Sequence, residues 1–218
     1  MKLSTLAERL EPSATLALAA KAKAMKAEGK DVISFATGEP DFDTPRAVVD
    51  AAVASMRAGD TRYEMAKGMP ELRQAVCEKL KRDNGLDYDA DDIVMTPGAK
   101  LAILDALYML LEKGDEVIVP VPYWVSYPAH VKLAGGVMKT IETDAKSDFK
   151  MTANQLEAAI GPKTKVLILN SPSNPTGAVY TKEELENIAK VCLKHGVAVI
   201  SDEIYEKLTY GVKHHSIA

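Results

Sequence analysis

Four short apolar runs decide the fold, and in chain order they are EVIV (116–119), VMKTI (137–141), VLILN (166–170) and VAVIS (197–201). Stretches with helical spacing lie between them, and two begin with a capping box: Thr152 with Gln155, and Thr181 with Glu184. Short apolar strands that alternate with helices are typical of a sheet buried on both faces. The sequence therefore predicts an α/β fold with a mostly parallel sheet sandwiched by helices.

The chain upstream of these runs has a mixed pattern. Residues 13–28 form an Ala/Lys-rich stretch that predicts a helix, and residues up to 44 are otherwise irregular. Helical spacing then predicts helices over 70–84 and 98–112, with a strand over 92–96 between them. Further on, residues 124–134 are predicted to be helical. We expect an N-terminal helical and irregular segment, 1–44, followed by the regular part, 45–218.

The composition excludes several classes of protein. The chain has 218 residues, a formal net charge of -4 and 47% hydrophobic residues, which is ordinary for a globular protein. The absence of a basic block gives no support to nucleic-acid binding. The longest apolar stretch is too short to span a bilayer, and the first residues do not resemble a secretory signal, so we expect a cytoplasmic protein. Cys77 and Cys192 lie in helical patterns, which indicates reduced core thiols and no metal site.

Ligands of such sheets bind at the carboxyl ends of the strands. The small residues Gly98 and Ala99, followed by Lys100, stand where a helix is expected to begin, and backbone N–H groups there can bind an anion. A tight turn without a ligand is the alternative. Trp124, the only tryptophan, follows another strand and offers a flat platform for a ring, although a core aromatic is the alternative.

Polar side chains follow the last two strands. Asn174 lies in the rigid loop NSPSNPTG (170–177), and Asp202 and Tyr205 follow the final apolar run. A helix-capping Asp with a surface Tyr is the alternative for this pair. An anion site, an aromatic plate, an amide and a carboxylate–phenol pair together suit a planar, phosphorylated, cationic heterocycle. Pyridoxal phosphate is such a ligand, because a carboxylate keeps its ring nitrogen protonated.

Several longer segments are recognisable as motifs: GEPDFDTP (38–45), RY (62–63), GMPELR (68–73), GAK (98–100), PYWVSYP (122–128), NSPSNPTG (170–177) and SDEIY (201–205). Through them the whole chain resembles the class I pyridoxal-phosphate-dependent aminotransferases, in particular the bacterial aspartate aminotransferases. The resemblance implies that residues 1–44 form an arm and part of a small domain, and that 45–218 form part of the cofactor-binding large domain. It also implies a homodimer with shared active sites.

The resemblance implies a role for each residue of the site. The residues implied to hold the cofactor are Gly98, Ala99 and Lys100 at its phosphate, Trp124 against its ring, Asn174 and Tyr205 at its ring oxygen, and Asp202 at its ring nitrogen. Gly38, Trp124 and Asn174 are implied to contact the substrate. Asp202 and Tyr63 are implied to be catalytic, with Tyr63 reaching the cofactor phosphate of the neighbouring subunit.

Aspartate and 2-oxoglutarate are the substrates that the resemblance favours. Lys100 could pair with the distal carboxylate of an acidic substrate, and Thr15 could donate a hydrogen bond to it. The alternatives are an aromatic or alanine aminotransferase, or a carbon–sulfur lyase, because these enzymes share the cofactor residues.

The resemblance also implies a Schiff-base lysine in a Ser-rich motif downstream of SDEIY, and an arginine that binds the substrate carboxylate. The segment after Tyr205 contains Lys207 and Lys213 but no such motif. We therefore expect an N-terminal fragment of an aminotransferase, inactive as this 218-residue chain alone. The alternative is that the natural protein has this length and serves only as a binding or dimerisation module.

Overall fold

The structure is a computed structural model that describes all residues except 1, 9, 11–13, 36–37 and 39–40. It divides into two compact units: Met1–Leu10 with Glu71–Ala218, and Glu11–Pro70. Glu39 and Pro40 of the GEPDFDTP motif, and Ser13 of the first predicted helix, lie outside the described residues. The boundary predicted at residue 44 concerns family domains and stays a prediction.

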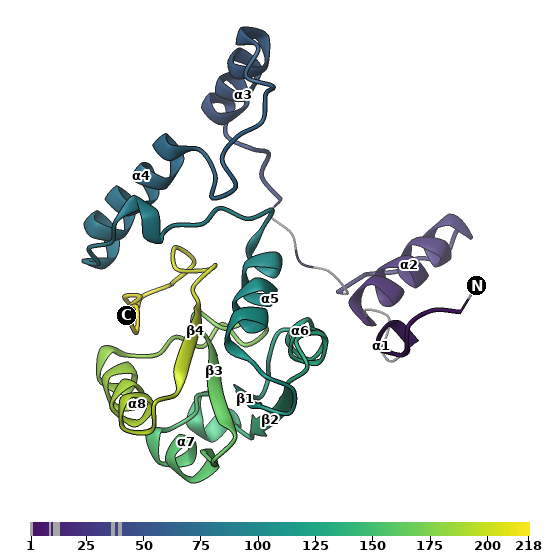
Figure 1. The fold of residues 1–218 in the computed structure, drawn as a ribbon. Helices are drawn as coiled ribbons and strands as arrows, with labels where there is room; N and C mark the ends of the chain where they lie inside the picture. The colour runs from purple at the N-terminus through teal and green to yellow at the C-terminus, as the bar shows by residue number, and fades with distance from the viewer. Residues whose placement is uncertain (1, 9, 11–13, 36–37, 39–40) are drawn as a thin grey trace. The chain divides into compact units, whose positions relative to one another are not determined.

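A four-stranded sheet forms the centre of the larger unit (Figure 1). Its strands are β1 (Glu116–Pro120), β2 (Val137–Ile141), β3 (Thr164–Asn170) and β4 (Ala198–Asp202). They lie in the order β2-β1-β3-β4, and every pair is parallel. The predicted parallel α/β fold is therefore confirmed, and all four carboxyl ends lie along one edge.

Helices cover both faces of this sheet (Figure 1). Helices α5 (Ala99–Leu110) and α6 (Tyr127–Leu133) pack on one face, and α7 (Ala153–Ala159) and α8 (Lys182–His195) on the other. Successive residues of β3 alternate between the two cores, since side chains along a strand point to opposite faces. Val166 and Ile168 join the α5–α6 core, whereas Leu167 and Leu169 join the α7–α8 core.

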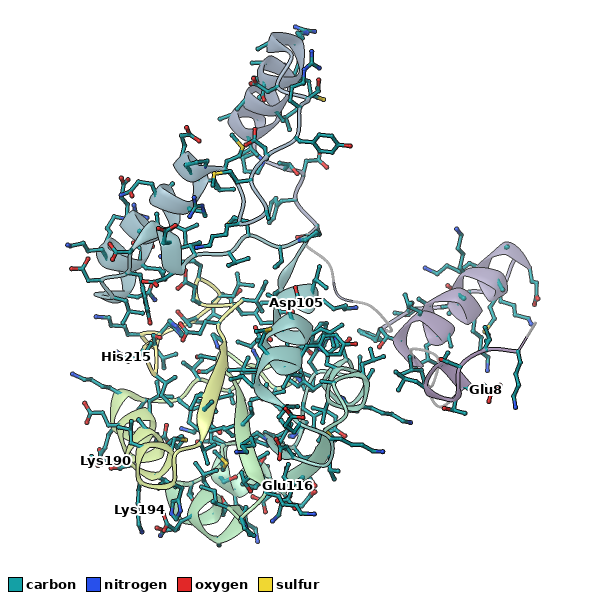
Figure 2. All side chains as sticks on the ribbon, in the orientation of Figure 1. Glu8, Asp105, Glu116, Lys190, Lys194 and His215 are labelled. Atoms are coloured by element: carbon teal, nitrogen blue, oxygen red, sulfur yellow. The ribbon has the colours of Figure 1, made fainter. Side chains whose placement is uncertain are left out.

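Local signals set the ends of the covering helices. The predicted capping boxes of α7 and α8 are both present, because the Thr152 and Thr181 side chains accept hydrogen bonds from the third helical N–H. Helix α8 ends at Gly196, whose φ of 65° is left-handed and suits a residue without a side chain. Lys190 and Lys194 project from the solvent side of this helix (Figure 2).

Two predicted elements differ from the structure. Residues 93–96 form no strand and pair with no described strand, so the strand predicted over 92–96 is wrong, and Val94 is 59% exposed. An apolar run becomes a strand only where a neighbour completes its hydrogen bonds. The helix predicted over 124–134 begins at Tyr127 instead, which leaves Trp124 in the loop before α6.

The remaining helices are α1 (Thr5–Glu8), α2 (Ala14–Ala27), α3 (Arg46–Ala58) and α4 (Pro70–Lys79). A π-helical turn, Leu80–Asn84, extends α4 and ends at Gly85, as predicted for the helix over 70–84. Among the described residues, no helix is long and apolar enough to cross a membrane.

Both cysteines are free and buried, Cys77 in α4 and Cys192 in α8, as predicted. Burial raises the pKa of the Cys192 thiol to about 11, which leaves little reactive thiolate at neutral pH.

Candidate functional site

A cavity of about 250 Å³ lies at the carboxyl edge of the sheet. Its lining residues come from four separate segments and are Gly98, Ala99, Lys100, Trp124, Asn170, Asn174, Asp202, Ile204 and Tyr205. The structure thus brings together all seven residues predicted to hold a cofactor. Asn170 and Ile204 are additions to that set.

One end of the cavity offers backbone hydrogen-bond donors. Helix α5 begins after Gly98, whose φ of 91° belongs to the left-handed region that favours glycine. The N–H groups of Ala99 and Lys100 have no hydrogen-bond acceptor among the described residues. Unpaired N–H groups at the positive end of a helix dipole form a binding site for an anion.

The Trp124 indole is held in place by three neighbouring side chains. The rings of Tyr127 and His130 meet it nearly perpendicularly, with centroids 5.5 and 5.8 Å away. The Lys100 ammonium lies 5.2 Å from the indole centroid, which is a cation–π distance. These contacts hold a flat, half-buried aromatic surface at the cavity wall.

Asp202 ends β4, and its carboxylate is held from two sides. The Tyr127 hydroxyl donates to Oδ2 at 2.6 Å, and the Ile204 N–H donates to Oδ1 at 3.3 Å. Burial and the neighbouring Asp202 charge raise the pKa of Tyr127 far above its usual value. Tyr127 therefore stays protonated and serves as a permanent donor to Asp202.

Replacing Tyr127 with Phe should lower the free energy of unfolding by about 1–2 kcal/mol, because Asp202 loses a donor while the packing remains. The pKa of Tyr127 is raised in the folded state, so its contribution is present below pH 10 and is lost as pH rises further. Urea unfolding of wild type and Tyr127→Phe at pH 7 measures this difference. Equal stabilities would show that the hydroxyl contributes nothing.

Asn170 organises the loop that carries Asn174. Its side-chain amide donates to the Asp202 carbonyl at 2.9 Å, and its side-chain oxygen accepts from the Asn174 N–H at 2.7 Å. The Asn174 amide in turn reaches the Tyr205 hydroxyl at 3.4 Å. One asparagine at the end of β3 thereby links β4 to the loop, and two polar groups converge on the cavity wall.

No role was predicted for Tyr127, Asn170 or His130 from the sequence. His130 is 4% exposed and its Nδ1 has no partner among the described residues. Burial, with a smaller effect of Lys100, lowers the pKa of His130, so the ring beside Trp124 is neutral at pH 7. The sequence signal for Tyr127 is its place in the PYWVSYP motif with Trp124, whereas its burial and its bond to Asp202 appear only in the structure.

Three predicted residues belong to the other compact unit. Thr15 lies in α2, Gly38 lies in the segment after it, and Tyr63 follows α3. Gly38 and Tyr63 are exposed within the described structure. Their roles in substrate and cofactor binding stay predictions.

A parallel α/β domain with an anion site, an aromatic plate and a carboxylate along one strand edge defines a class of cofactor-binding enzyme domains. The sequence profile of the family "Aminotransferase class I and II" matches residues 30–217. The chain therefore belongs to the class I and II aminotransferases.

Two relatives and two solved structures show what the chain is similar to. Aspartate aminotransferases of Bacillus sp. (strain YM-2) and Bacillus subtilis (strain 168) are 54% and 50% identical to it, over 99% of its length and 55% of theirs. The Thermus thermophilus aspartate aminotransferase with maleate superposes with a TM-score of 0.97 at 44% identity, over 100% of this chain and 57% of that one. An alanine aminotransferase from Pyrococcus furiosus superposes with a TM-score of 0.94 at 33% identity, over 99% and 56%. The chain thus spans about half the length of these proteins.

Proposed function

We propose that this chain is the cofactor-binding part of a pyridoxal-phosphate-dependent aminotransferase, which moves an amino group between an amino acid and a 2-oxo acid. The observation that carries the proposal is the convergence of Gly98, Ala99, Lys100, Trp124, Asn174, Asp202 and Tyr205 on one cavity. Membership of the aminotransferase family supports it independently.

The cavity's own chemistry fits pyridoxal phosphate. The unpaired N–H groups of Ala99 and Lys100 suit the phosphate, and the Trp124 indole suits the flat ring. The Asp202 carboxylate suits a protonated ring nitrogen, because an anion in a partly buried place favours a cation beside it. The Asn174 amide and Tyr205 hydroxyl suit the ring oxygen.

When bound, this cofactor withdraws electrons from the carbon of the amino acid that loses a proton. The chain's residues orient the cofactor and hold one proton in place. Asp202 keeps the proton on the ring nitrogen, and the Tyr127 hydroxyl and Ile204 N–H direct the carboxylate toward the cavity. Trp124 keeps water from one face of the ring.

For the substrates we propose aspartate and 2-oxoglutarate. The relatives named aspartate aminotransferase support this pair, and so does the position of Lys100 at the cavity wall. Its ammonium lies against Trp124 and can reach an anion in the cavity. Aspartate and 2-oxoglutarate each carry a distal carboxylate that this ammonium would bind.

In the full-length protein, Lys100→Ala should lower kcat/KM for aspartate about tenfold or more. The loss of kcat/KM for alanine should be much smaller. The reason is that only the acidic substrate loses an ion pair. Steady-state kinetics with both substrates measures the ratio, and Lys182→Ala on the exposed side of α8 is the matched control. Equal losses for aspartate and alanine would contradict the role of Lys100.

A second activity on the same fold has support of its own, because an alanine aminotransferase superposes well on this chain. The cofactor residues alone do not separate aspartate, aromatic and alanine aminotransferases or a carbon–sulfur lyase. A panel of aspartate, tyrosine, alanine and cystathionine with the product of the complete reading frame tests the proposal. Pyruvate and ammonia released without a 2-oxo acid would identify a lyase.

We further propose that the protein works as a homodimer. The exposed Tyr63 supports this, since the resemblance implies that it contributes to a neighbour's cofactor phosphate. Sedimentation velocity with pyridoxal phosphate should give the mass of a dimer, and a monomer at micromolar concentration would contradict the proposal.

A further inference from the structure

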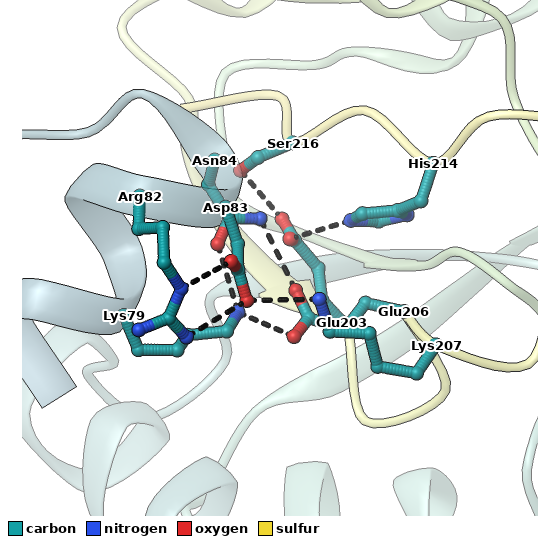
Figure 3. Close-up of polar contacts among 9 residues, drawn as sticks. All are labelled: Lys79, Arg82, Asp83, Asn84, Glu203, Glu206, Lys207, His214 and Ser216. Atoms are coloured by element: carbon teal, nitrogen blue, oxygen red, sulfur yellow. Dashed lines mark hydrogen bonds and ion pairs between the residues drawn. The ribbon is translucent and has the colours of Figure 1, made fainter.

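The turn after β4 presents its side chains to two sides. Asp202 and Tyr205 line the cavity, whereas Glu203 and Glu206 take part in a separate polar cluster (Figure 3). Two hydrogen bonds close the turn: Glu206 N–H to the Glu203 carbonyl at 3.0 Å, and Leu208 N–H to the Tyr205 carbonyl at 2.8 Å. The backbone of this turn therefore connects the cavity with the cluster.

Glu203 is held by three donors from the chain that flanks the turn. Ser201 donates to its Oε1 at 2.6 Å. Ser216 donates to the same oxygen at 2.7 Å, and His214 Nε2 lies 2.9 Å from its Oε2 (Figure 3). The side chains of Glu203 and His214 are only 19% and 8% exposed. Both carboxylate oxygens are thus occupied in a mostly buried place.

Glu206 is held by the end of α4 and the π-helical turn that follows it. The Lys79 ammonium forms an ion pair with Glu206 Oε1, and the Asn84 amide donates to Oε2 at 3.1 Å (Figure 3). Lys79 also donates to Asn84 Oδ1 at 2.8 Å, which closes a triangle of contacts. The Glu206 side chain is 16% exposed.

Burial opposes the charge of Glu206, but the hydrogen bonds from Lys79 and Asn84 outweigh it and lower the pKa of Glu206. Glu206 is therefore an anion at neutral pH with a fixed partner. A third contact to the turn, from Asp83 to Lys207, lies near the surface, since the Lys207 side chain is 69% exposed. A pair with one largely exposed partner contributes little.

The orientation of the Asp202 carboxylate depends on this turn. One of its two hydrogen bonds comes from the Ile204 N–H, which belongs to the turn between Glu203 and Glu206. Tyr205, which meets Asn174, lies between Ile204 and Glu206. A shift of the turn would move both cavity groups together.

We propose that Glu203 and Glu206 are positioning residues. They fix this turn on the side away from the cavity and thereby hold Asp202 and Tyr205 in the geometry that the cofactor ring requires. The inference rests on the proposed function. Glu203, Glu206 and His214 also have potential ligand atoms within 4.8 Å of one another, but protein donors already occupy the four carboxylate oxygens. The cluster therefore acts through its internal contacts.

The test uses this chain and pyridoxamine 5'-phosphate, a probe without an aldehyde that could react with surface lysines. Quenching of the only tryptophan, Trp124, gives the affinity, and the pH dependence of the bound ring's absorbance gives the pKa of its nitrogen. The variants are Lys79→Met, its conservative counterpart Lys79→Arg, and Glu203→Gln. Glu157→Gln is the matched control, because Glu157 also binds a lysine and a histidine, Lys194 and His195, but does not line the cavity.

Lys79→Met and Glu203→Gln should each weaken binding by about tenfold and lower the pKa of the bound ring nitrogen by about one unit. Lys79→Arg should restore both quantities, and Glu157→Gln should leave both unchanged. Circular dichroism identifies a variant that does not fold, in which case the other one carries the test.

The outcomes separate the inference from the proposed function. Binding by wild type with unchanged affinity and ring pKa in folded Lys79→Met and Glu203→Gln would overturn the positioning role alone. An equal effect of Glu157→Gln would overturn it too, because general stability would then explain the change. If wild type does not bind the probe, the proposed function fails and the positioning role fails with it.

Discussion

Asp202→Asn should weaken the binding of pyridoxamine 5'-phosphate to this chain by about 10- to 100-fold. The substitution keeps the shape of the side chain, and its amide oxygen can still accept from Tyr127 Oη. It removes the charge that faces the protonated ring nitrogen, and a hydrogen bond to a charged group contributes about 1.5–3 kcal/mol. Quenching of Trp124 fluorescence measures the loss directly.

Asp105→Asn is the matched control for this experiment. Asp105 lies on the exposed side of α5 and does not line the cavity (Figure 2). Its replacement by Asn is the same chemical change as Asp202→Asn. Its affinity should equal that of wild type. If Asp202→Asn also binds like wild type, Asp202 does not face the ring nitrogen and the orientation assigned to the cofactor is wrong.

Leu107→Ala should lower the free energy of unfolding by about 2–5 kcal/mol. Leu107 is 0% exposed in the middle of the α5–α6 core, and alanine suits a helix, so the loss comes from the cavity left behind. A loss of this size is a large fraction of the stability of a typical domain. Urea unfolding followed by circular dichroism measures it.

Met109→Ala on the same helix is the control, since that side chain is 85% exposed. It should change the free energy of unfolding by less than about 0.5 kcal/mol. Equal effects of the two substitutions would mean that α5 does not pack on the sheet as described.

The sheet and its covering helices could be predicted because their signals are local. The four apolar runs became the four strands, and Thr152 and Thr181 begin helices as their capping boxes indicate. Residues 92–96 were predicted wrongly because strand formation depends on a neighbour that local sequence does not specify.

The residues that line the cavity could be predicted because parallel strands bring their carboxyl ends to one edge. The loops after β1, β3 and β4 therefore had to meet. Tyr127 and Asn170 were missed because their roles depend on contacts across 75 and 32 residues of sequence, to Asp202. The positioning role of Glu203 and Glu206 was missed for the same reason, since Glu206 contacts Asn84 across 122 residues of sequence.

We expect the cavity to bind a phosphorylated pyridine ring, with its phosphate at the start of α5 and its ring against Trp124. Titrating this chain with pyridoxamine 5'-phosphate, and in parallel with pyridoxamine, while following the fluorescence of Trp124 tests it most directly. We expect saturable quenching by the phosphorylated compound, with an affinity at least about tenfold higher than that for pyridoxamine. Only the phosphorylated compound can bind the N–H groups of α5 that have no acceptor in the described part of the chain. No saturable quenching, or equal affinity for the two compounds, would contradict it.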